Sequence, residues 1–195
     1  MAAVMHPDFP YLWPVKPLTF DDVQAIWREN EIDQEHWKKF WRERGFNSWE
    51  EWRQPRINAV RATNKEWQLY LVVDPLKAVP EFHGGPYKGW RDQFYEGATM
   101  PAFKDIREHW AAAEFLANFP NDTTLIGWLT RCDSPPGEVV IVEGMHRCAA
   151  VTKASREGRP FGSMVYLAGA EIPFFEIPDF TADPILPLSQ TISRS

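Results

Sequence analysis

The sequence of 195 residues has only two cysteines, Cys132 and Cys148, and no long run of apolar residues. Two cysteines are too few for a disulfide framework or a cysteine-rich zinc site, and a reducing compartment leaves both as thiols. No apolar stretch approaches the roughly 20 residues that span a bilayer, and the first residues do not have the pattern of a secretory signal. We therefore expect a cytoplasmic protein without a membrane segment.

An excess of positive charge is also missing. The chain has 27 acidic and 21 basic residues, which gives a formal net charge of −6, and it contains no long block of Lys and Arg. A broad surface for a nucleic-acid backbone requires such an excess. The charge balance therefore argues against a nucleic-acid partner, while the 44% of apolar residues can supply the core of one ordinary domain.

Tryptophan, by contrast, is abundant, with ten copies in the chain. Five of them lie between residues 20 and 62, in three segments with helical spacing that are too short to be stable alone. Residues 1–18 before these segments hold four prolines, and proline can neither continue a helix nor donate to a strand ladder. We interpret residues 1–62 as an extended arm followed by a Trp-rich helical subdomain.

Capping residues mark the ends of these three helices. Thr19 precedes two acidic residues and is predicted to cap a helix over residues 20–30. Gly45 is expected to end the second helix in a left-handed conformation. Ser48, followed three residues later by Glu51, predicts a capping box at the start of the third helix.

After residue 66 the apolar spacing changes to a strand pattern. The sequence predicts strands over residues 67–73, 123–129, 139–143 and 163–168, and helices over residues 103–119 and 145–156. Residues 80–101 are rich in glycine and proline and predict a long loop that would close as a lid. This order of elements indicates an α/β (α+β) domain over residues 63–178, followed by a mobile tail over residues 179–195.

The most informative junction leads from a buried strand through Gly144 into the helix that starts at Met145. Unpaired N–H groups and the helix dipole favour an anion at such a position, yet His146 and Arg147 place basic side chains there. Two explanations remain open. Either a carboxylate such as Glu143 compensates for the basic residues, or a bound phosphate does, with Arg147 as a bidentate donor and His146 as a second hydrogen-bonding group.

Residues 143–150, Glu-Gly-Met-His-Arg-Cys-Ala-Ala, resemble the Gly-x-His-Arg-x-x-Ala signature of the ParB and sulfiredoxin superfamily, which also includes free serine kinases. The resemblance covers roughly residues 67–177 and implies a ParB/sulfiredoxin-like mixed sheet with helices. In that family the signature binds nucleotide phosphates, which implies ATP or ADP as ligand, with Mg²⁺ bound through the phosphates. The residues to which the resemblance gives this role are Gly144, Met145, His146 and Arg147.

Departures from the signature separate the activities of this family. Sulfiredoxins place a catalytic cysteine where this chain has Met145, and a thioether cannot act as a thiolate nucleophile. Cys148 is interpreted as a small core residue. Partition proteins of the ParB type continue with a helix-turn-helix segment, for which the residues after Ala168 leave little room. The resemblance is therefore closest to the free serine kinase branch.

The kinase branch implies a phosphotransferase that moves a phosphoryl group from the nucleotide to a small hydroxylated acceptor. Its base would be Glu81, because these kinases carry a glutamate shortly after their first strand; Asp74 is the competing carboxylate, and a solvated loop position is the other explanation for Glu81. Lys88 and Thr124 are further candidates for phosphate contact. No histidine pair has the spacing of metal ligands, so we expect no protein-held zinc site.

A second class of function uses the Trp-rich helices. In this alternative the protein is a non-catalytic nucleotide-sensing or protein-interaction module, and exposed tryptophans such as Trp37 or Trp49 form the partner surface. The competing explanation is the buried core of a helix bundle, with the interleaved basic and acidic residues on a solvated outer face. The exposure of the tryptophans decides between the two.

Overall fold

The computed structural model describes residues 6–131 and 137–180. Their strands form one mixed sheet in the order β1-β2-β5-β3-β4. The bounds are β1 (Leu12–Leu18), β2 (Trp67–Val72), β3 (Asp122–Thr130), β4 (Glu138–Glu143) and β5 (Met164–Glu171). The β3 and β5 strands run parallel, and the other neighbouring pairs are antiparallel. The expected mixed sheet with helices is confirmed for these residues.

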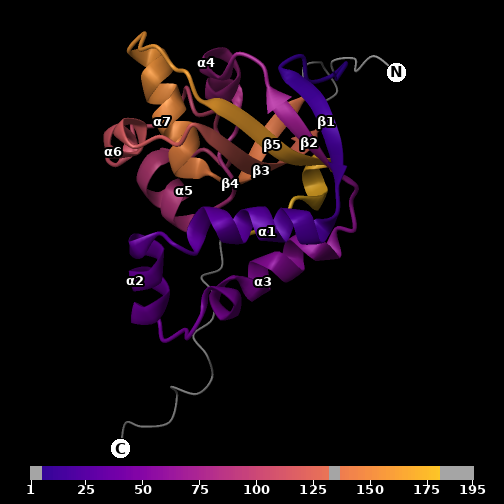
Figure 1. The fold of residues 1–195 in the computed structure, drawn as a ribbon, viewed down its shortest axis with the longest axis vertical. Coiled ribbons are helices and arrows are strands. Elements are labelled where there is room, and N and C mark those ends of the chain that lie inside the picture. The colour runs from indigo at the N-terminus through magenta and orange to yellow at the C-terminus, as the bar shows by residue number, and fades with distance from the viewer. Residues whose placement is uncertain (1–5, 132–136, 181–195) are drawn as a thin grey trace, which may run out of the picture.

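Seven α-helices belong to the same part of the chain. They are α1 (Phe20–Glu31), α2 (Glu35–Glu43), α3 (Trp49–Ala62), α4 (Pro75–Ala78), α5 (Lys88–Phe94), α6 (Ala112–Ala117) and α7 (Met145–Arg156). Figure 1 shows α1, α2 and α3 grouped below the sheet, and α5, α6 and α7 grouped to its left. None of the helices in the described residues is long and apolar enough to cross a membrane.

The predicted helix caps are present. Thr19 accepts a hydrogen bond from the N–H of Asp22, whose carboxylate accepts in return from the N–H of Thr19. Ser48 accepts from the N–H of Glu51, but the carboxylate of Glu51 bonds to the N–H of the residue before Ser48, so the second half of that predicted box is replaced. Gly45 follows α2 with a φ of +78°, as expected for a residue that ends a helix.

The N-terminal arm is part of the sheet, which the sequence analysis does not predict. Residues 12–18 form β1, an edge strand that pairs antiparallel with β2. Prolines fit there because one side of an edge strand has no ladder partner. The pairing register also shifts between Pro14 and Lys16. The proline pattern correctly predicts extended backbone, but it does not reveal the strand with which that backbone pairs.

The segment predicted as a long loop, residues 80–101, contains the helix α5, so this prediction is wrong in part. Its glycines and prolines hide the helical spacing of Trp90 and Phe94, which are both buried. Earlier in the same segment, the N–H of His83 donates to the carbonyl of Val139 in β4. Backbone pairing therefore ties the beginning of this segment to the sheet.

The helix predicted over residues 103–119 is also wrong in its length, because only the six residues of α6 are helical there. The N–H groups of Phe103 and Lys104 donate to the carbonyls of residues 82 and 80, so long-range pairing replaces helical hydrogen bonds. Trp110, in the part of this segment that is not helical, has 77% of its surface exposed.

One buried cluster of apolar side chains connects the sheet with the N-terminal helices. Trp27 of α1, Trp49 of α3 and Trp128 of β3 are among its largest members, and each is at most 1% exposed. Cys148 is a buried free thiol in α7. Cys132 and the predicted tail after Phe180 lie outside the described residues.

Candidate functional site

A cavity of about 330 Å³, called here the α7 cavity, lies at the start of α7. Its aromatic lining consists of Trp27, Trp37, Phe40, Trp52, Tyr87, Trp90, Phe115, His146 and Phe180. Its charged lining consists of Glu31, Arg44, Arg53, Arg56, Lys88, Glu143 and Arg147. These residues come mainly from α1, α2, α3, α5 and α7. Basic side chains therefore outnumber acidic ones around a cavity whose walls are largely aromatic.

Gly144 allows β4 to lead directly into α7. Its φ is +102°, a conformation that favours glycine. A Cβ at this position would lie 2.4 Å from Cδ2 of Leu125 and 3.2 Å from Nη2 of Arg147. Backbone conformation and space therefore both require glycine, and the residues that follow are brought to the wall of the α7 cavity.

We expect Gly144→Ala to lower the free energy of unfolding by about 1–3 kcal/mol, because a strained φ and a steric contact add. Urea denaturation measures the loss. Gly158→Ala is the matched control, since Gly158 also has a positive φ, of +62°, but no atom lies within 4 Å of the added Cβ. Equal losses in the two variants would show that the contact with Leu125 contributes nothing.

Arg147 is buried, and neighbouring residues already hold its guanidinium. Nη2 forms an ion pair with Glu143, and Nη1 donates to Oδ1 of Asn30 at 3.1 Å and to the hydroxyl of Thr123. Of the two explanations for the basic helix start, the compensating carboxylate therefore describes Arg147. Thr124 does not line the α7 cavity, and its carbonyl oxygen accepts from Asn30 at 2.9 Å.

Burial also sets the protonation of two further residues at this junction. It raises the pKa of Glu143, while the charge of Arg147 acts in the opposite direction. Asn30 donates to Oε2 of Glu143 at 2.6 Å. Burial likewise raises the pKa of the Cys148 thiol, so Cys148 is a core residue and not a thiolate nucleophile, as the sequence predicts.

His146 lies among aromatic rings and not against a charged group. It stacks on Phe115 with 5.1 Å between ring centroids and 9° between planes, and it meets His109 edge to face at 4.7 Å. Burial lowers the pKa of His146 to about 3 and the pKa of His109 to about 4. Both rings are therefore neutral at neutral pH, and Arg147 carries the only positive charge in the first turn of α7.

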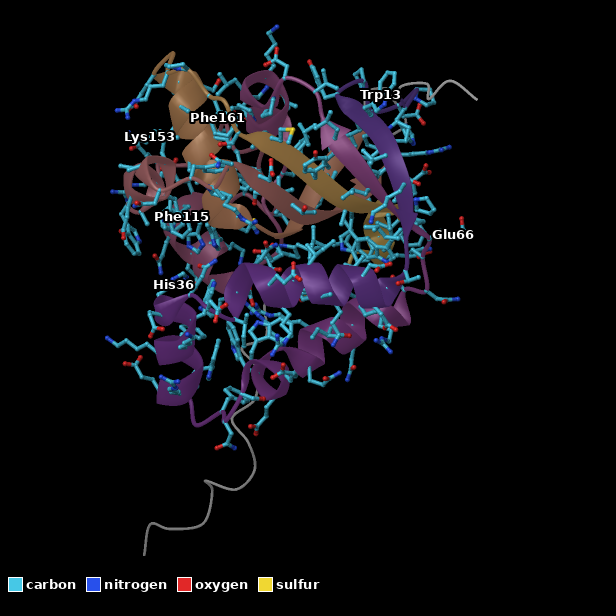
Figure 2. The ribbon with its side chains drawn as sticks, viewed as in Figure 1. Trp13, His36, Glu66, Phe115, Lys153 and Phe161 are labelled. Carbon is cyan, nitrogen blue, oxygen red and sulfur yellow. The ribbon has the colours of Figure 1, made fainter. Side chains whose placement is uncertain are left out.

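This aromatic cluster connects the N-terminal helices with α6 and α7. His36 of α2 lies 6.3 Å from the rings of both Phe115 and His146, and Figure 2 shows His36 next to Phe115. Trp37 lies 6.1 Å from His146. The Trp-rich helices therefore form part of the wall around the residues that resemble the family signature.

The tryptophans of the N-terminal helices face inward. Trp27, Trp41, Trp49 and Trp52 are at most 4% exposed, and Trp37 is partly buried against the core. The expected surface of exposed tryptophans is therefore absent from the described N-terminal helices. The buried core of the competing explanation is confirmed, but its solvated outer face is not, because Arg53 is only 3% exposed.

Lys88 and Met145 both make contacts at the start of α5 or in the segment just before it. Lys88 is the first residue of α5 and lines the α7 cavity, where its ammonium group pairs with Asp92 one turn later. The sulfur of Met145 accepts from the N–H of Gly85 at 3.4 Å. The start of α7 and the segment before α5 are therefore in direct contact.

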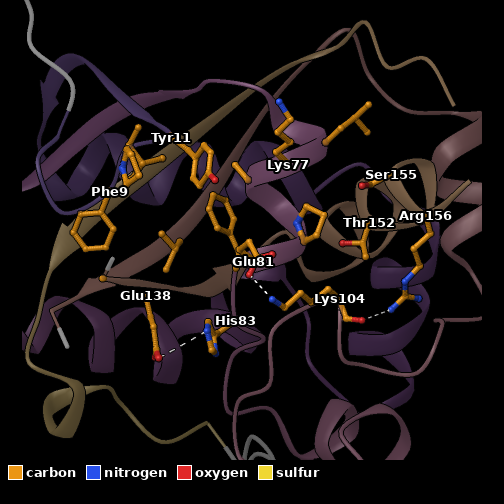
Figure 3. A pocket seen from close by; sticks show the side chains of 18 residues that line it. Phe9, Tyr11, Lys77, Glu81, His83, Lys104, Glu138, Thr152, Ser155 and Arg156 are labelled. Carbon is orange, nitrogen blue, oxygen red and sulfur yellow. Dashed lines mark hydrogen bonds and ion pairs between the residues drawn. The ribbon is translucent and has the colours of Figure 1, made fainter. Parts of the chain in front are cut away.

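Glu81 lies in a different cavity, shown in Figure 3, which has a volume of about 650 Å³ and is called here the Glu81 cavity. Its walls come from residues before β1, from α4, from the start of β4 and from the last turns of α7. The carboxylate of Glu81 is half exposed and forms an ion pair with Lys104 at 2.7 Å. Asp74, the competing carboxylate, pairs with Lys77 at 2.9 Å.

The two cavities share no lining residue. The structure therefore does not bring Glu81 together with residues 144–147. The short helical turns at Pro75–Ala78 and Val79–Glu81 lead the chain after β2 toward the last turns of α7, and not toward its first turn. Because these turns redirect the chain, the number of residues after β2 does not predict where the carboxylate of Glu81 lies.

The sequence pattern does not indicate that Arg44, Arg53 and Arg56 line a cavity. They lie in the Trp-rich segment, outside the part that resembles the family. The available signal was the alternation of basic residues with tryptophan, which predicts a solvated outer face when nearby acidic residues balance the charge. In the structure these three arginines line the α7 cavity.

Hydrogen-bond donors exceed acceptors in the wall of the α7 cavity. Arg44, Arg53, Arg56, Lys88 and Arg147 supply donors to this wall, whereas the indole N–H groups of Trp27 and Trp52 are fully buried and are not part of the accessible surface of the cavity. The carboxylates that line it are already paired with arginines, Glu31 with Arg53 and Glu143 with Arg147. A ligand that brings acceptor atoms would complement this wall.

No group of three His, Cys, Asp or Glu side chains within residues 6–131 and 137–180 is placed to hold a metal ion. No family model, curated protein or solved structure matches the chain. The function is therefore inferred from the chemical groups around the cavities.

Proposed function

We propose that this protein binds a nucleotide, ATP or ADP, in the α7 cavity and transfers a phosphoryl group from it to a small hydroxylated acceptor. The observation that carries the proposal is the combination of aromatic rings with an excess of basic side chains around one cavity. A nucleotide has a planar base and anionic phosphates, which these two kinds of group bind. The proposed location is the cytoplasm, which agrees with the free thiol of Cys148.

The resemblance to the ParB and sulfiredoxin superfamily supports the choice of phosphoryl transfer. The junction of β4 and α7 at Gly144 and the mixed sheet agree with a ParB/sulfiredoxin-like fold, which we propose for this chain. The cavity volume of about 330 Å³ also falls in the range of small-molecule sites, about 300–1,000 Å³. The basic side chains in the wall fit the oxygens of a phosphate group.

Mg²⁺ would be held through the phosphates, because the described residues offer no set of three protein ligands for it. When bound, the ion supplies charge neutralisation on the phosphate oxygens. The residues of this chain supply positioning, stacking surfaces and a base. Phosphoryl transfer requires mainly these contributions.

Within this proposal Glu143 is the base, because it is a carboxylate of the α7 cavity and Glu81 is not. Arg147 and Asn30 hold the Glu143 carboxylate in place. It would accept the proton of the acceptor hydroxyl while the phosphoryl group passes to that oxygen. The acceptor class, a small hydroxylated molecule, is part of the proposal.

Calorimetric titration with ATP, ADP, CTP and GTP, in the presence of Mg²⁺, tests the proposal. We expect saturable binding of at least one nucleotide, and nucleotide turnover in a screen of hydroxy amino acids and small alcohols. Glu143→Gln should keep binding but lose about 100-fold or more of the turnover, whereas Glu81→Gln, in the other cavity, should keep both.

The outcomes separate the possible functions. No binding of any of the four nucleotides would contradict the proposal. Binding without turnover would identify a non-catalytic nucleotide sensor, and turnover that does not depend on an acceptor would identify a nucleotidase.

A further inference from the structure

The cations of the α7 cavity differ in how far they are already neutralised. Arg147 is paired with Glu143, and Arg53 is paired with Glu31 at 2.5 Å. A carboxylate at such a distance repels an incoming anion nearly as strongly as the arginine attracts it. The two buried arginines therefore contribute little net charge to the binding of a phosphate.

Arg44 is different. It follows α2, is partly buried, and forms no ion pair with any described residue. Its guanidinium carbon lies 3.4 Å from the centroid of the Phe40 ring, and Nη1 donates weakly to the carbonyl of Phe40 at 3.4 Å. Stacking fixes the plane of the guanidinium and leaves most of its N–H donors available. Arg44 is thus an oriented cation in the cavity wall.

Arg56 in α3 lines the same cavity. Its guanidinium carbon lies 4.9 Å from the centroid of the Tyr87 ring, and the hydroxyl of Tyr87 donates to the carbonyl of Val142, next to the proposed base. Phe40, on which Arg44 stacks, lies 5.5 Å from the ring of Trp52, one helical turn before Arg56. The two arginines therefore belong to one wall, which reaches the end of β4.

From these contacts we infer that Arg44, and not Arg147, binds the phosphates of the nucleotide, with the nucleobase directed toward the aromatic cluster around His146. This inference rests on the proposed function and assigns the phosphate contacts to the N-terminal helices, which lie outside the part of the chain that resembles the family. Arg56 and Tyr87 continue this wall toward Val142, next to Glu143. The neutral rings of Trp37, Phe115 and His146 offer the nucleobase a surface without charge.

Calorimetric titration of the full chain with ATP, ADP and adenosine, in the presence of Mg²⁺, tests the inference. Arg44→Gln should weaken the affinity for ATP and ADP by about 10-fold, because hydrogen bonds to charged groups are the strong ones. Arg42→Gln is the matched control, since Arg42 lies in α2 but is exposed and does not line the cavity. It should leave the affinity unchanged.

Two additional measurements separate binding from folding. Arg44→Lys keeps the charge but not the planar fork, so it should lose less affinity than Arg44→Gln, whereas a folding defect would affect both variants alike. Adenosine has no phosphate, so Arg44→Gln should leave its affinity unchanged. A loss of adenosine affinity equal to the loss of ATP affinity would overturn the inference.

The remaining outcomes distinguish this inference from the proposed function. If the unaltered chain binds ATP or ADP and Arg44→Gln does not change the affinity, the inference is wrong and the proposed function stands. If only Arg147→Gln loses affinity for ATP and ADP, and its thermal unfolding midpoint is unchanged, the phosphates bind at the start of α7 instead. If the unaltered chain binds no nucleotide, both proposals fail.

Discussion

Arg53→Met is expected to lower the free energy of unfolding by about 3–5 kcal/mol, because it leaves the carboxylate of Glu31 buried without its charge partner. Glu31 is 2% exposed and Arg53 is 3% exposed. The carboxylate accepts from Nε of Arg53 at 2.6 Å, from Nη2 at 2.5 Å and from the indole N–H of Trp49 at 2.8 Å. Urea denaturation at neutral pH measures the loss.

Two controls give this prediction its meaning. Arg28→Ala removes an ion pair with Glu50 in which both side chains are about half exposed, so it should cost less than about 1 kcal/mol. The double variant Glu31→Leu/Arg53→Met removes both charges and should lose less than Arg53→Met alone. A loss in Arg53→Met no larger than in Arg28→Ala would mean that the burial of the pair carries no energetic consequence.

The ion pair also explains how the N-terminal helices reach the candidate site. Glu31 ends α1, Arg53 lies in α3, and both line the α7 cavity. Arg53 stacks on Trp52 with 3.5 Å from its guanidinium carbon to the ring centroid. The pair and the ring together fix α1 against α3 and turn the tryptophans inward. A wall that holds Arg44 and Arg56 is the result of this packing.

The sequence predicts those parts of the fold whose signals are local. Thr19 and Ser48 predict the starts of α1 and α3, because a cap is a contact within three residues. Gly144 and Gly158 correctly bracket α7, since each has a positive φ at an end of the helix. Runs of apolar residues likewise predict β2 to β5.

Features that depend on partners far along the chain are not predictable in this way. The pairing of β1 with β2 joins segments about 55 residues apart in sequence, and nothing local in the proline-rich arm specifies it. The pairing of Arg53 with Glu31 spans 22 residues, so the charge pattern alone looks like a solvated helix face. The separation of Glu81 from residues 144–147 has the same origin, because the path of the chain after β2 decides it.

Lowering the pH from 7 to 5 is expected to destabilise the protein by about 2–4 kcal/mol through its histidine cluster. In the folded protein, burial lowers the pKa of His146 to about 3 and that of His109 to about 4. In the unfolded chain both have the ordinary pKa of about 6.5. Between these values the unfolded chain binds protons that the folded protein does not bind. The stability is therefore complete above about pH 6.5 and falls as the pH decreases toward 3 to 4.

Urea denaturation at pH 7 and pH 5 measures this loss in the unaltered chain and in His146→Phe. Phenylalanine keeps a ring against Phe115 but cannot bind a proton, so His146→Phe should remove about half of the pH-dependent loss. Phe115→Leu is the matched control, because it alters the same cluster without removing a titrating group and should keep the full pH dependence. Burial raises the pKa of Glu143, which acts in the opposite direction at low pH, so the measurement does not extend below pH 5. The same pH dependence in the unaltered chain, His146→Phe and His109→Phe would show that the neutral rings do not contribute. That result would contradict the idea that the nucleobase binds to an uncharged ring surface around His146.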